Sequence, residues 1–216
     1  AFGLSLLARL KPRWFAVQTL VLCPTRELAD QVATEIRRLA RAEDNVKVVT
    51  VYGGVPSRNQ IASLENGAHI VVGTPGRVMD LIERDVLDLS ALNTLVLDEA
   101  DRMLDMGFYA DIVTVATQCP ADRQTLLFSA TYPDGIAQLA QRFMRDPQTI
   151  KVASQHSANK IEQRWYEVKE SERLHAVSQL LAHFRPESSI AFCNTKQQCR
   201  DLVGVLQAEG VRALAL

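Results

Sequence analysis

The chain has 216 residues, of which 47% are hydrophobic and 23% charged, and it has room for one full core and part of a second. No apolar run approaches the roughly 18–20 residues that a membrane-spanning helix needs, so we expect no membrane span. The formal net charge of −1 gives no support to nucleic-acid binding through bulk positive charge, and any such contact must come from individually placed groups.

Short apolar strands alternate with amphipathic helices along the chain. The strand candidates are residues 19–23, 47–52, 69–73, 94–98, 124–129, 149–153, 161–168 and 188–193. Apolar residues at helical spacing follow the first strand at Ala29, Ala33 and Ile36, and the same pattern recurs later. This alternation predicts βαβ units and therefore an α/β fold, in which a doubly wound, mainly parallel sheet carries helices on both faces.

A polar stretch at residues 153–160 predicts a linker between two domains. The first domain, 1–152, opens on an apolar helix without a leader sequence or an initiator Met, and we expect it to be truncated at its N-terminus. The second, 161–216, carries helical faces around Leu181 and Leu202 and stops at what reads as the start of a strand. We therefore expect the second domain to be incomplete.

The cysteines and histidines give no sign of a metal centre. The four cysteines form no C-x-x-C pair, and no histidine lies at metal-ligand spacing from any of them. We interpret the cysteines as reduced thiols of a cytoplasmic protein.

Four residues that follow a buried apolar strand say most about the chemistry. Asp98, Glu99, Ala100 and Asp101 come directly after Thr94–Leu97, and an open α/β sheet binds its ligands just beyond such strand ends. In a functional interpretation Asp98 holds Mg²⁺ through water, Glu99 acts as a base towards an attacking water, and Asp101 braces a neighbouring loop. The alternative is that these acids are first-turn helix residues favoured by the helix dipole.

The first strand is followed by a helix start that could grip a phosphate group. Pro24, Thr25 and Arg26 join strand 19–23 to its helix. Thr25 suits the N-cap position, and free backbone N–H groups together with Arg26 suit an anion. An ordinary capped helix is the alternative.

The third strand is followed by a similar device. Thr74 suits the cap, Pro75 the first helical position, and Gly76 allows another backbone to come close. Arg77 supplies a guanidinium fork suited to phosphate.

A turn at Gly53 and Gly54, after strand 47–52, exposes backbone in the same way. Each of these three loops alone is explained by simple turn chemistry. Three of them at the same end of one parallel sheet predict a track for a sugar–phosphate backbone. Such contacts suit sequence-tolerant binding of a single strand.

Ser129 and Thr131 end strand 124–129 with two small hydroxyl groups. These groups can hydrogen-bond a carboxylate such as that of Asp101, which would link the acidic motif to the neighbouring loop. The alternative is a Ser/Thr cap before the helix near Pro133. Asn194-Thr195 later in the chain reads only as a capping signal.

Taken in order, these motifs resemble the DEAD-box ATP-dependent RNA helicases of superfamily two. The motifs that carry the resemblance are Pro24–Ala29, Gly53-Gly54, Thr74–Arg77, Asp98–Asp101 and Ser129–Thr131, and Phe192–Lys196 looks like the first motif of the family's second RecA-like domain. The resemblance covers nearly the whole chain.

The resemblance implies two RecA-like domains that close over ATP, Mg²⁺ and single-stranded RNA. It implies that Asp98 and Glu99 serve Mg²⁺ and water activation, and that Asp101, Ser129 and Thr131 couple hydrolysis to strand separation. The residues of the three backbone-exposing loops would bind RNA. Within the family, the chain is most similar to a bacterial helicase of large-subunit ribosome assembly, which implies a monomer acting on ribosomal RNA.

One part of the family's ATP site is missing from the sequence. No G-x-x-x-x-G-K-[ST] phosphate loop occurs in these 216 residues, nor do the later second-domain motifs. Without the N–H cradle and the Lys of such a loop, the β- and γ-phosphates have no holder. We therefore expect this segment, taken from a longer helicase, to hydrolyse ATP poorly by itself.

Three other functions remain as alternatives. The chain could be a non-catalytic RNA-binding module that uses the backbone-gripping loops alone. It could belong to a DNA-directed helicase, although the order of motifs argues against this. An unrelated doubly wound enzyme such as a dehydrogenase lacks support, because no G-x-G-x-x-G fingerprint follows the first strand.

Overall fold

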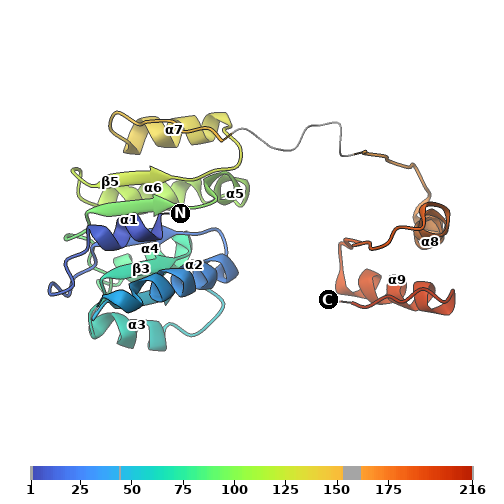
Figure 1. Cartoon of the computed structure of the whole chain (residues 1–216), viewed down its shortest axis with the longest axis horizontal. Coiled ribbons are helices and arrows are strands. Elements are labelled where there is room, and N and C mark those ends of the chain that lie inside the picture. The colour runs from blue at the N-terminus through green and yellow to red at the C-terminus, as the bar shows by residue number, and fades with distance from the viewer. Residues whose placement is uncertain (1, 44, 153–161, 216) are drawn as a thin grey trace. The chain divides into compact units, whose positions relative to one another are not determined.

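Five short strands lie side by side in one parallel sheet in the computed structural model of the chain (Figure 1). The structure describes residues 2–43, 45–152 and 162–215. The chain divides into two compact units, 1–150 and 151–216, which are described separately.

The first unit contains the sheet. Its elements are α1 (Gly3–Ala8), β1 (Thr19–Leu22), α2 (Arg26–Leu39), the 3₁₀ turn η1 (Ala40–Ala42), β2 (Val48–Val51), α3 (Arg58–Glu65), β3 (Ile70–Gly73), α4 (Pro75–Glu83), β4 (Thr94–Leu97), α5 (Ala100–Asp105), α6 (Tyr109–Gln118), β5 (Gln124–Leu127) and α7 (Asp134–Phe143). The strand order is β2-β3-β1-β4-β5, so β5 pairs only with β4 among the described strands.

Both faces of the sheet are covered, which explains why its strands are apolar at nearly every position. Leu20 and Leu22 of β1 pack on one face of the sheet, in a cluster with residues of α3 to α7. Val21 packs on the other face, in a cluster with residues of α1 and α2. Successive side chains of a strand point to opposite faces, so a four-residue strand buried on both sides needs four apolar or small residues. The predicted α/β fold, a parallel sheet with helices on both faces, is confirmed (Figure 1).

The second unit holds the 3₁₀ turn η3 (Glu170–Glu172) and the helices α8 (Arg173–Phe184) and α9 (Lys196–Ala208). The two predicted helices are confirmed, and Thr195 caps α9 by accepting a hydrogen bond from the Gln198 N–H at 3.1 Å. None of the helices in the described ranges is long and apolar enough to cross a membrane.

The strands predicted beyond residue 148 do not form in the described part of the chain. Residues 149–152, 162–168 and 188–193 have no regular structure, and apolar side chains within them, such as Phe192 at 94% exposure, face solvent. A β-favouring run becomes a strand only when a neighbour pairs with its N–H and C=O groups, and no described segment of this unit does so. The linker predicted at 153–160 lies outside the described residues.

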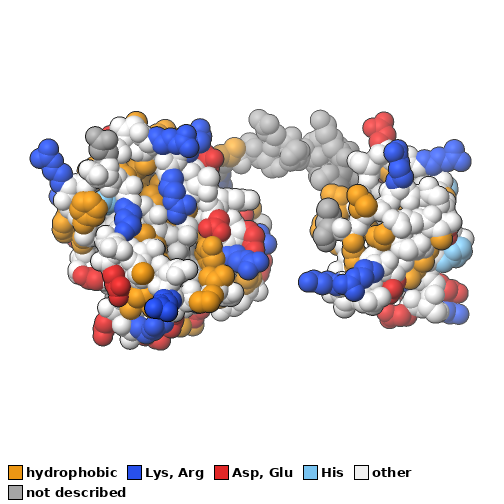
Figure 2. Space-filling model, turned by 90° about the horizontal axis from the view of Figure 1, so that it is seen from below, with side chains coloured by type: hydrophobic (Ala, Val, Ile, Leu, Met, Phe, Trp, Pro, Cys, Tyr) orange, Lys and Arg blue, Asp and Glu red, His pale blue; other side chains and the backbone are white. Residues whose placement is uncertain are grey.

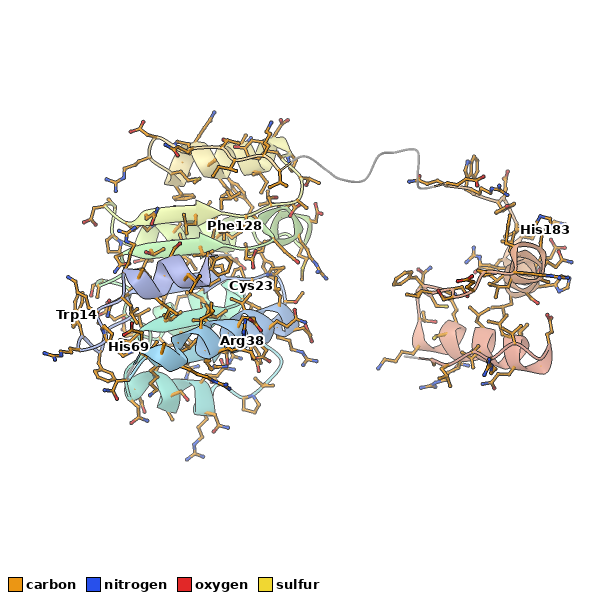
Figure 3. All side chains as sticks on the ribbon, viewed as in Figure 1. Trp14, Cys23, Arg38, His69, Phe128 and His183 are labelled. Carbon is orange, nitrogen blue, oxygen red and sulfur yellow. The ribbon has the colours of Figure 1, made fainter. Side chains whose placement is uncertain are left out.

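A buried histidine connects backbone segments at the amino-terminal ends of the strands. His69 is 0% exposed, and its Nδ1 accepts a hydrogen bond from the Lys47 N–H at 3.0 Å. The ring proton must then lie on Nε2, which donates to the Pro12 carbonyl at 3.0 Å. The Phe15 ring packs against His69 at a tilt of 47°, with the ring centroids 4.6 Å apart. Figure 3 labels His69 and Trp14 at this end of the sheet. Burial lowers the pKa of His69, the Pro12 hydrogen bond raises it, and the charge of Lys47 lowers it again, with a net decrease.

We expect the chain to lose stability as the pH falls below 6.5. Unfolded His69 takes up a proton near its ordinary pKa of 6.5, whereas folded His69 stays neutral, so acid favours the unfolded state until the lowered folded pKa is reached. Urea unfolding at pH 7.5 and pH 5.5 measures the loss. Between these two pH values, the free energy of unfolding should fall less in His69→Gln than in the wild type. In His183→Gln, a change at an exposed position, it should fall as much as in the wild type. Equal losses in the wild type and His69→Gln would contradict the assignment.

Candidate functional site

All five strands are parallel, so their carboxyl ends form a single rim of the sheet. The ladder continues into the loops beyond the strands. Thr74 N donates to the Val51 carbonyl at 3.0 Å, and Asp98 N donates to the Leu22 carbonyl at 3.0 Å. Cys23, labelled in Figure 3, lies at this rim, opposite the end that carries His69. The rim predicted from the sequence is therefore present.

The order of strands sorts the predicted site residues into two neighbouring groups. The loops after β2, β3 and β1 carry the predicted backbone-binding residues, and the loops after β4 and β5 carry the acidic and hydroxyl residues. The loop after β1 lies between the two groups because β1 pairs with both β3 and β4.

Asp98 occupies the first position after β4. Its carboxylate is half-buried and accepts a hydrogen bond from the Glu99 N–H at 3.1 Å. Burial raises the pKa of Asp98, the Glu99 N–H opposes this, and the nearby charge of Glu99 raises the pKa further. Asp98 also borders a hollow of about 410 Å³ between α1 and α2.

Glu99 has a left-handed backbone, with φ 49° and ψ 51°. This conformation costs a residue other than glycine roughly 1–2 kcal/mol, and such strain is concentrated at functional sites. The Glu99 carboxylate is exposed, and it accepts a hydrogen bond at 3.2 Å from Arg102, one turn along α5. Sequence reasoning missed Arg102 because an arginine at i+3 of an acid is common on helix surfaces.

Asp101 ties α5 to the loop after β5. Its Oδ2 accepts hydrogen bonds from the Thr131 N–H at 2.9 Å and the Thr131 hydroxyl at 2.8 Å. Ser129 acts differently from the prediction: its Oγ accepts from the Asp101 backbone N–H at 3.3 Å and donates to the Thr131 carbonyl at 2.6 Å. The alternative Ser/Thr cap does not form, since Pro133 takes the N-cap position of α7.

The hydrogen bonds to Asp101 outweigh its burial. Burial raises the pKa of Asp101, but hydrogen bonds from the side chain and N–H of Thr131 and from the N–H of Arg102 help to lower it below its usual value. The carboxylate therefore stays charged at neutral pH and keeps α5 joined to the loop after β5.

The loop after β1 uses one predicted residue for the helix and leaves another exposed. Thr25 caps α2, accepting a hydrogen bond from the Leu28 N–H at 3.2 Å. Arg26 is exposed and pairs with the exposed Glu27 at 2.6 Å, and such a surface pair is weak enough for an anion to displace. Pro24 is buried and supports the loop without presenting its side chain.

The loop after β3 departs from the prediction in one respect. Thr74 occupies the N-cap position of α4, but its hydroxyl makes no hydrogen bond to the backbone N–H groups of the helix. Pro75 takes the first helical position as predicted and is buried. Gly76 is half-buried, and a Cβ there would lie 3.7 Å from a carboxylate oxygen of Asp111.

The turn after β2 is open to solvent. Gly53 and Gly54 are both exposed, and Gly54 has φ +79°, which glycine adopts without strain. A Cβ on Gly54 would lie 3.9 Å from Nη1 of Arg26, so this turn and the loop after β1 approach each other above β3.

Arg77 differs most from its predicted role. Its side chain is only 14% exposed, and Nη1 donates to Gln60 at 3.0 Å while Nη2 donates to the Val55 carbonyl at 3.1 Å. Nε lies 3.6 Å from Asp80. The guanidinium fork predicted for phosphate is therefore engaged within the protein. Sequence reasoning missed Gln60, because a glutamine in the first turn of a helix gives no signal of burial.

Several comparisons relate the chain to known proteins. A family model described as DEAD/DEAH box helicase matches residues 1–139. ATP-dependent RNA helicase DbpA of Escherichia coli K12 is 49% identical over 216 residues, which are the whole of this chain and 47% of that protein. DEAD-box ATP-dependent RNA helicase CshA of Streptococcus pneumoniae serotype 4 is 44% identical over 214 residues, covering 99% of this chain and 41% of that protein.

Solved structures give the same result. A DEAD box protein from the hyperthermophile Methanococcus jannaschii has a TM-score of 0.67 and 38% identity, covering all of this chain and 57% of its own. A Dbp5 variant of Saccharomyces cerevisiae bound to RNA and ADP BeF3 has a TM-score of 0.73 and 30% identity. The match covers 97% of this chain and 53% of the Dbp5 chain. The chain thus spans about half the length of the curated relatives it matches.

Proposed function

Because the chain belongs to the DEAD/DEAH box helicases, we propose that the protein containing it is an ATP-dependent RNA helicase. The observation that carries this proposal is the single rim on which Asp98 and Glu99 stand beside three backbone-exposing turns. Such a rim can bind a nucleotide on one half and a nucleic-acid strand on the other.

The donor groups at the acidic end fit Mg²⁺. Within residues 2–43, 45–152 and 162–215, no three His, Cys, Asp or Glu side chains converge as a metal site. Asp98 and the adjacent Glu99 offer carboxylate oxygens, the kind of ligand that Mg²⁺ prefers, and Mg²⁺ would take its remaining ligands from phosphate and water. Bound Mg²⁺ would neutralise charge on the phosphates. Glu99 would take the proton from the attacking water.

The other half of the rim would hold the sugar–phosphate backbone of RNA. We assign this contact to Arg26, Gly53, Gly54, Thr74 and Gly76, whose polar or backbone groups are accessible. Lys and Arg side chains are interspersed with Asp and Glu on the face of the first unit that Figure 2 shows. Binding should be sensitive to salt. The solved Dbp5 variant bound to RNA supports this assignment by similarity.

The Asp101–Thr131 contact would couple the acidic motif to the loop after β5. It joins α5, which carries the acidic motif, to the loop after β5 through two hydrogen bonds to one carboxylate oxygen. A change at the nucleotide would thereby shift Ser129 and Thr131, the two residues that the resemblance assigns to coupling hydrolysis with strand separation.

The resemblance in the motifs also suggests a finer role. We propose that the full-length protein acts as a monomer in the cytoplasm and remodels ribosomal RNA during ribosome assembly. We propose further that the 216-residue segment hydrolyses ATP poorly by itself, because its sequence contains no Gly-rich loop with Lys to hold the phosphates.

ATP hydrolysis by the full-length protein tests the main proposal. We expect single-stranded RNA to stimulate hydrolysis, a short RNA duplex to be separated, and DNA of the same sequence to have little effect. Equal stimulation by DNA would favour the DNA-directed alternative. Salt-sensitive RNA binding in a filter assay without any ATP hydrolysis would favour a non-catalytic RNA-binding module.

A further inference from the structure

Gln60 makes an unusual set of contacts for a residue outside every predicted motif. It lies in the first turn of α3 and is 9% exposed. Its Nε2 donates to the Tyr52 carbonyl at 3.0 Å, and its Oε1 accepts from the Tyr52 N–H at 3.2 Å. A side-chain amide that pairs with both backbone groups of one residue fixes that residue in position and orientation.

The same carboxamide reaches the next loop along the rim. Its Oε1 also accepts a hydrogen bond from Nη1 of Arg77 at 3.0 Å, and Nη2 of Arg77 donates to the Val55 carbonyl at 3.1 Å. Gln60 and Arg77 together therefore hold the turn Tyr52–Val55 at both of its ends.

This turn has little else to define it. Gly53 has no atom within 4 Å of a Cβ built on it, and Gly54 has the left-handed φ of +79°. Two successive exposed glycines give the chain its widest conformational freedom. Tyr52 adds one further contact, in which its hydroxyl donates to Asp30 of α2 at 3.0 Å. Without its end contacts, the turn would sample many conformations.

We propose that Gln60 is a positioning residue that presents the backbone of the Gly53–Gly54 turn to RNA, acting with Arg77. The inference rests on the proposed function, since it concerns the RNA half of the rim. Arg77 then serves as a support within the protein, and the phosphate contact falls to the exposed Arg26. Loss of Gln60 should weaken RNA binding and leave the acidic end unchanged, because Gln60 contacts neither Asp98 nor Glu99.

Steady-state ATP hydrolysis by the full-length protein, titrated with single-stranded RNA, tests the inference. Gln60→Leu keeps the approximate volume and removes all three hydrogen bonds. We expect the KM for RNA to rise about tenfold, as for the loss of a few net hydrogen bonds, while kcat at saturating RNA changes little. Gln141→Leu, an exposed glutamine of α7, is the matched control and should match the wild type. A role in folding alone would lower the active fraction, and hence kcat, without raising KM.

A second readout separates this inference from the proposed function. Hydrogen exchange at the Tyr52 amide should accelerate in Gln60→Leu whether or not RNA stimulates the protein. If RNA does not stimulate ATP hydrolysis by the wild type, the proposed function is wrong. The exchange rate of the Tyr52 amide would still show whether Gln60 holds Tyr52. A wild-type KM together with a wild-type exchange rate in Gln60→Leu would overturn the inference. If Gln60→Leu does not fold, Gln60→Glu, which cannot donate to the Tyr52 carbonyl, replaces it, and an unchanged KM overturns the inference equally.

Discussion

We expect Glu99→Gln in the full-length protein to lower the rate of ATP turnover by about 100- to 10,000-fold, the usual contribution of a general base. ATP and RNA should still bind. Glutamine has nearly the shape of glutamate but cannot take a proton, so the substitution removes the chemistry and keeps the volume. The exposed hydrogen bond to Arg102 weakens, at a cost of about 0–1 kcal/mol in stability.

A second carboxylate on the same helix supplies the control. Asp105→Asn changes an exposed acid at the end of α5 and should leave turnover as it is. Single-turnover hydrolysis and equilibrium binding of a fluorescent ATP analogue separate chemistry from binding. Unchanged turnover in Glu99→Gln would remove Glu99 from the mechanism, and a loss of ATP binding would assign it to holding the nucleotide.

Gly73→Ala costs about 3 kcal/mol of folding stability, at the upper end of the usual range for overpacking. A Cβ at this position would lie 2.4 Å from the Val51 carbonyl oxygen and 2.5 Å from Val51 Cγ2, with Val78 at 3.0 Å. The carbonyl cannot turn aside, because it accepts the hydrogen bond from Thr74 N that joins β2 to the loop after β3. The added methyl group must therefore push these neighbouring strands apart.

Gly53→Ala is the matched substitution without a clash. Its Cβ would have no neighbour within 4 Å, and its φ lies outside the left-handed region. We expect its free energy of unfolding, measured by urea titration, to stay within about 0.5 kcal/mol of the wild type, as for other surface changes. Equal midpoints for the two alanine variants would show that β3 has more room than the distances imply.

The sequence predicted the sheet of the first unit because burial on both faces leaves a plain pattern. Runs such as Thr94–Leu97 are apolar at nearly every position, and the helices between them repeat apolar residues at helical spacing. Parallel strands then force the loops that follow them onto one rim. For this reason the sequence alone predicts that residues as distant as Gly54 and Ser129 lie on the same rim.

Side-chain partners were predicted less well, because they depend on distances that no local pattern encodes. The Thr25 cap was predicted and forms, whereas the similar Thr74 makes no capping bond. Arg77 reads as a free phosphate fork in sequence, yet its burial against Gln60 emerges only from the packing of α3 beside α4. The strands expected after residue 148 failed for another reason: β-propensity makes a strand only when a partner strand is available.

The outer edge of β5 has a practical consequence for handling this segment. Among the described strands, β5 pairs with β4 alone, so its other side presents a row of unshared backbone donors and acceptors. Such an edge can form backbone hydrogen bonds with an extended segment of another chain, including a second copy of this chain. Any self-association of the 216-residue segment at high protein concentration should therefore be tested as edge-to-edge pairing before it is taken for a natural oligomer.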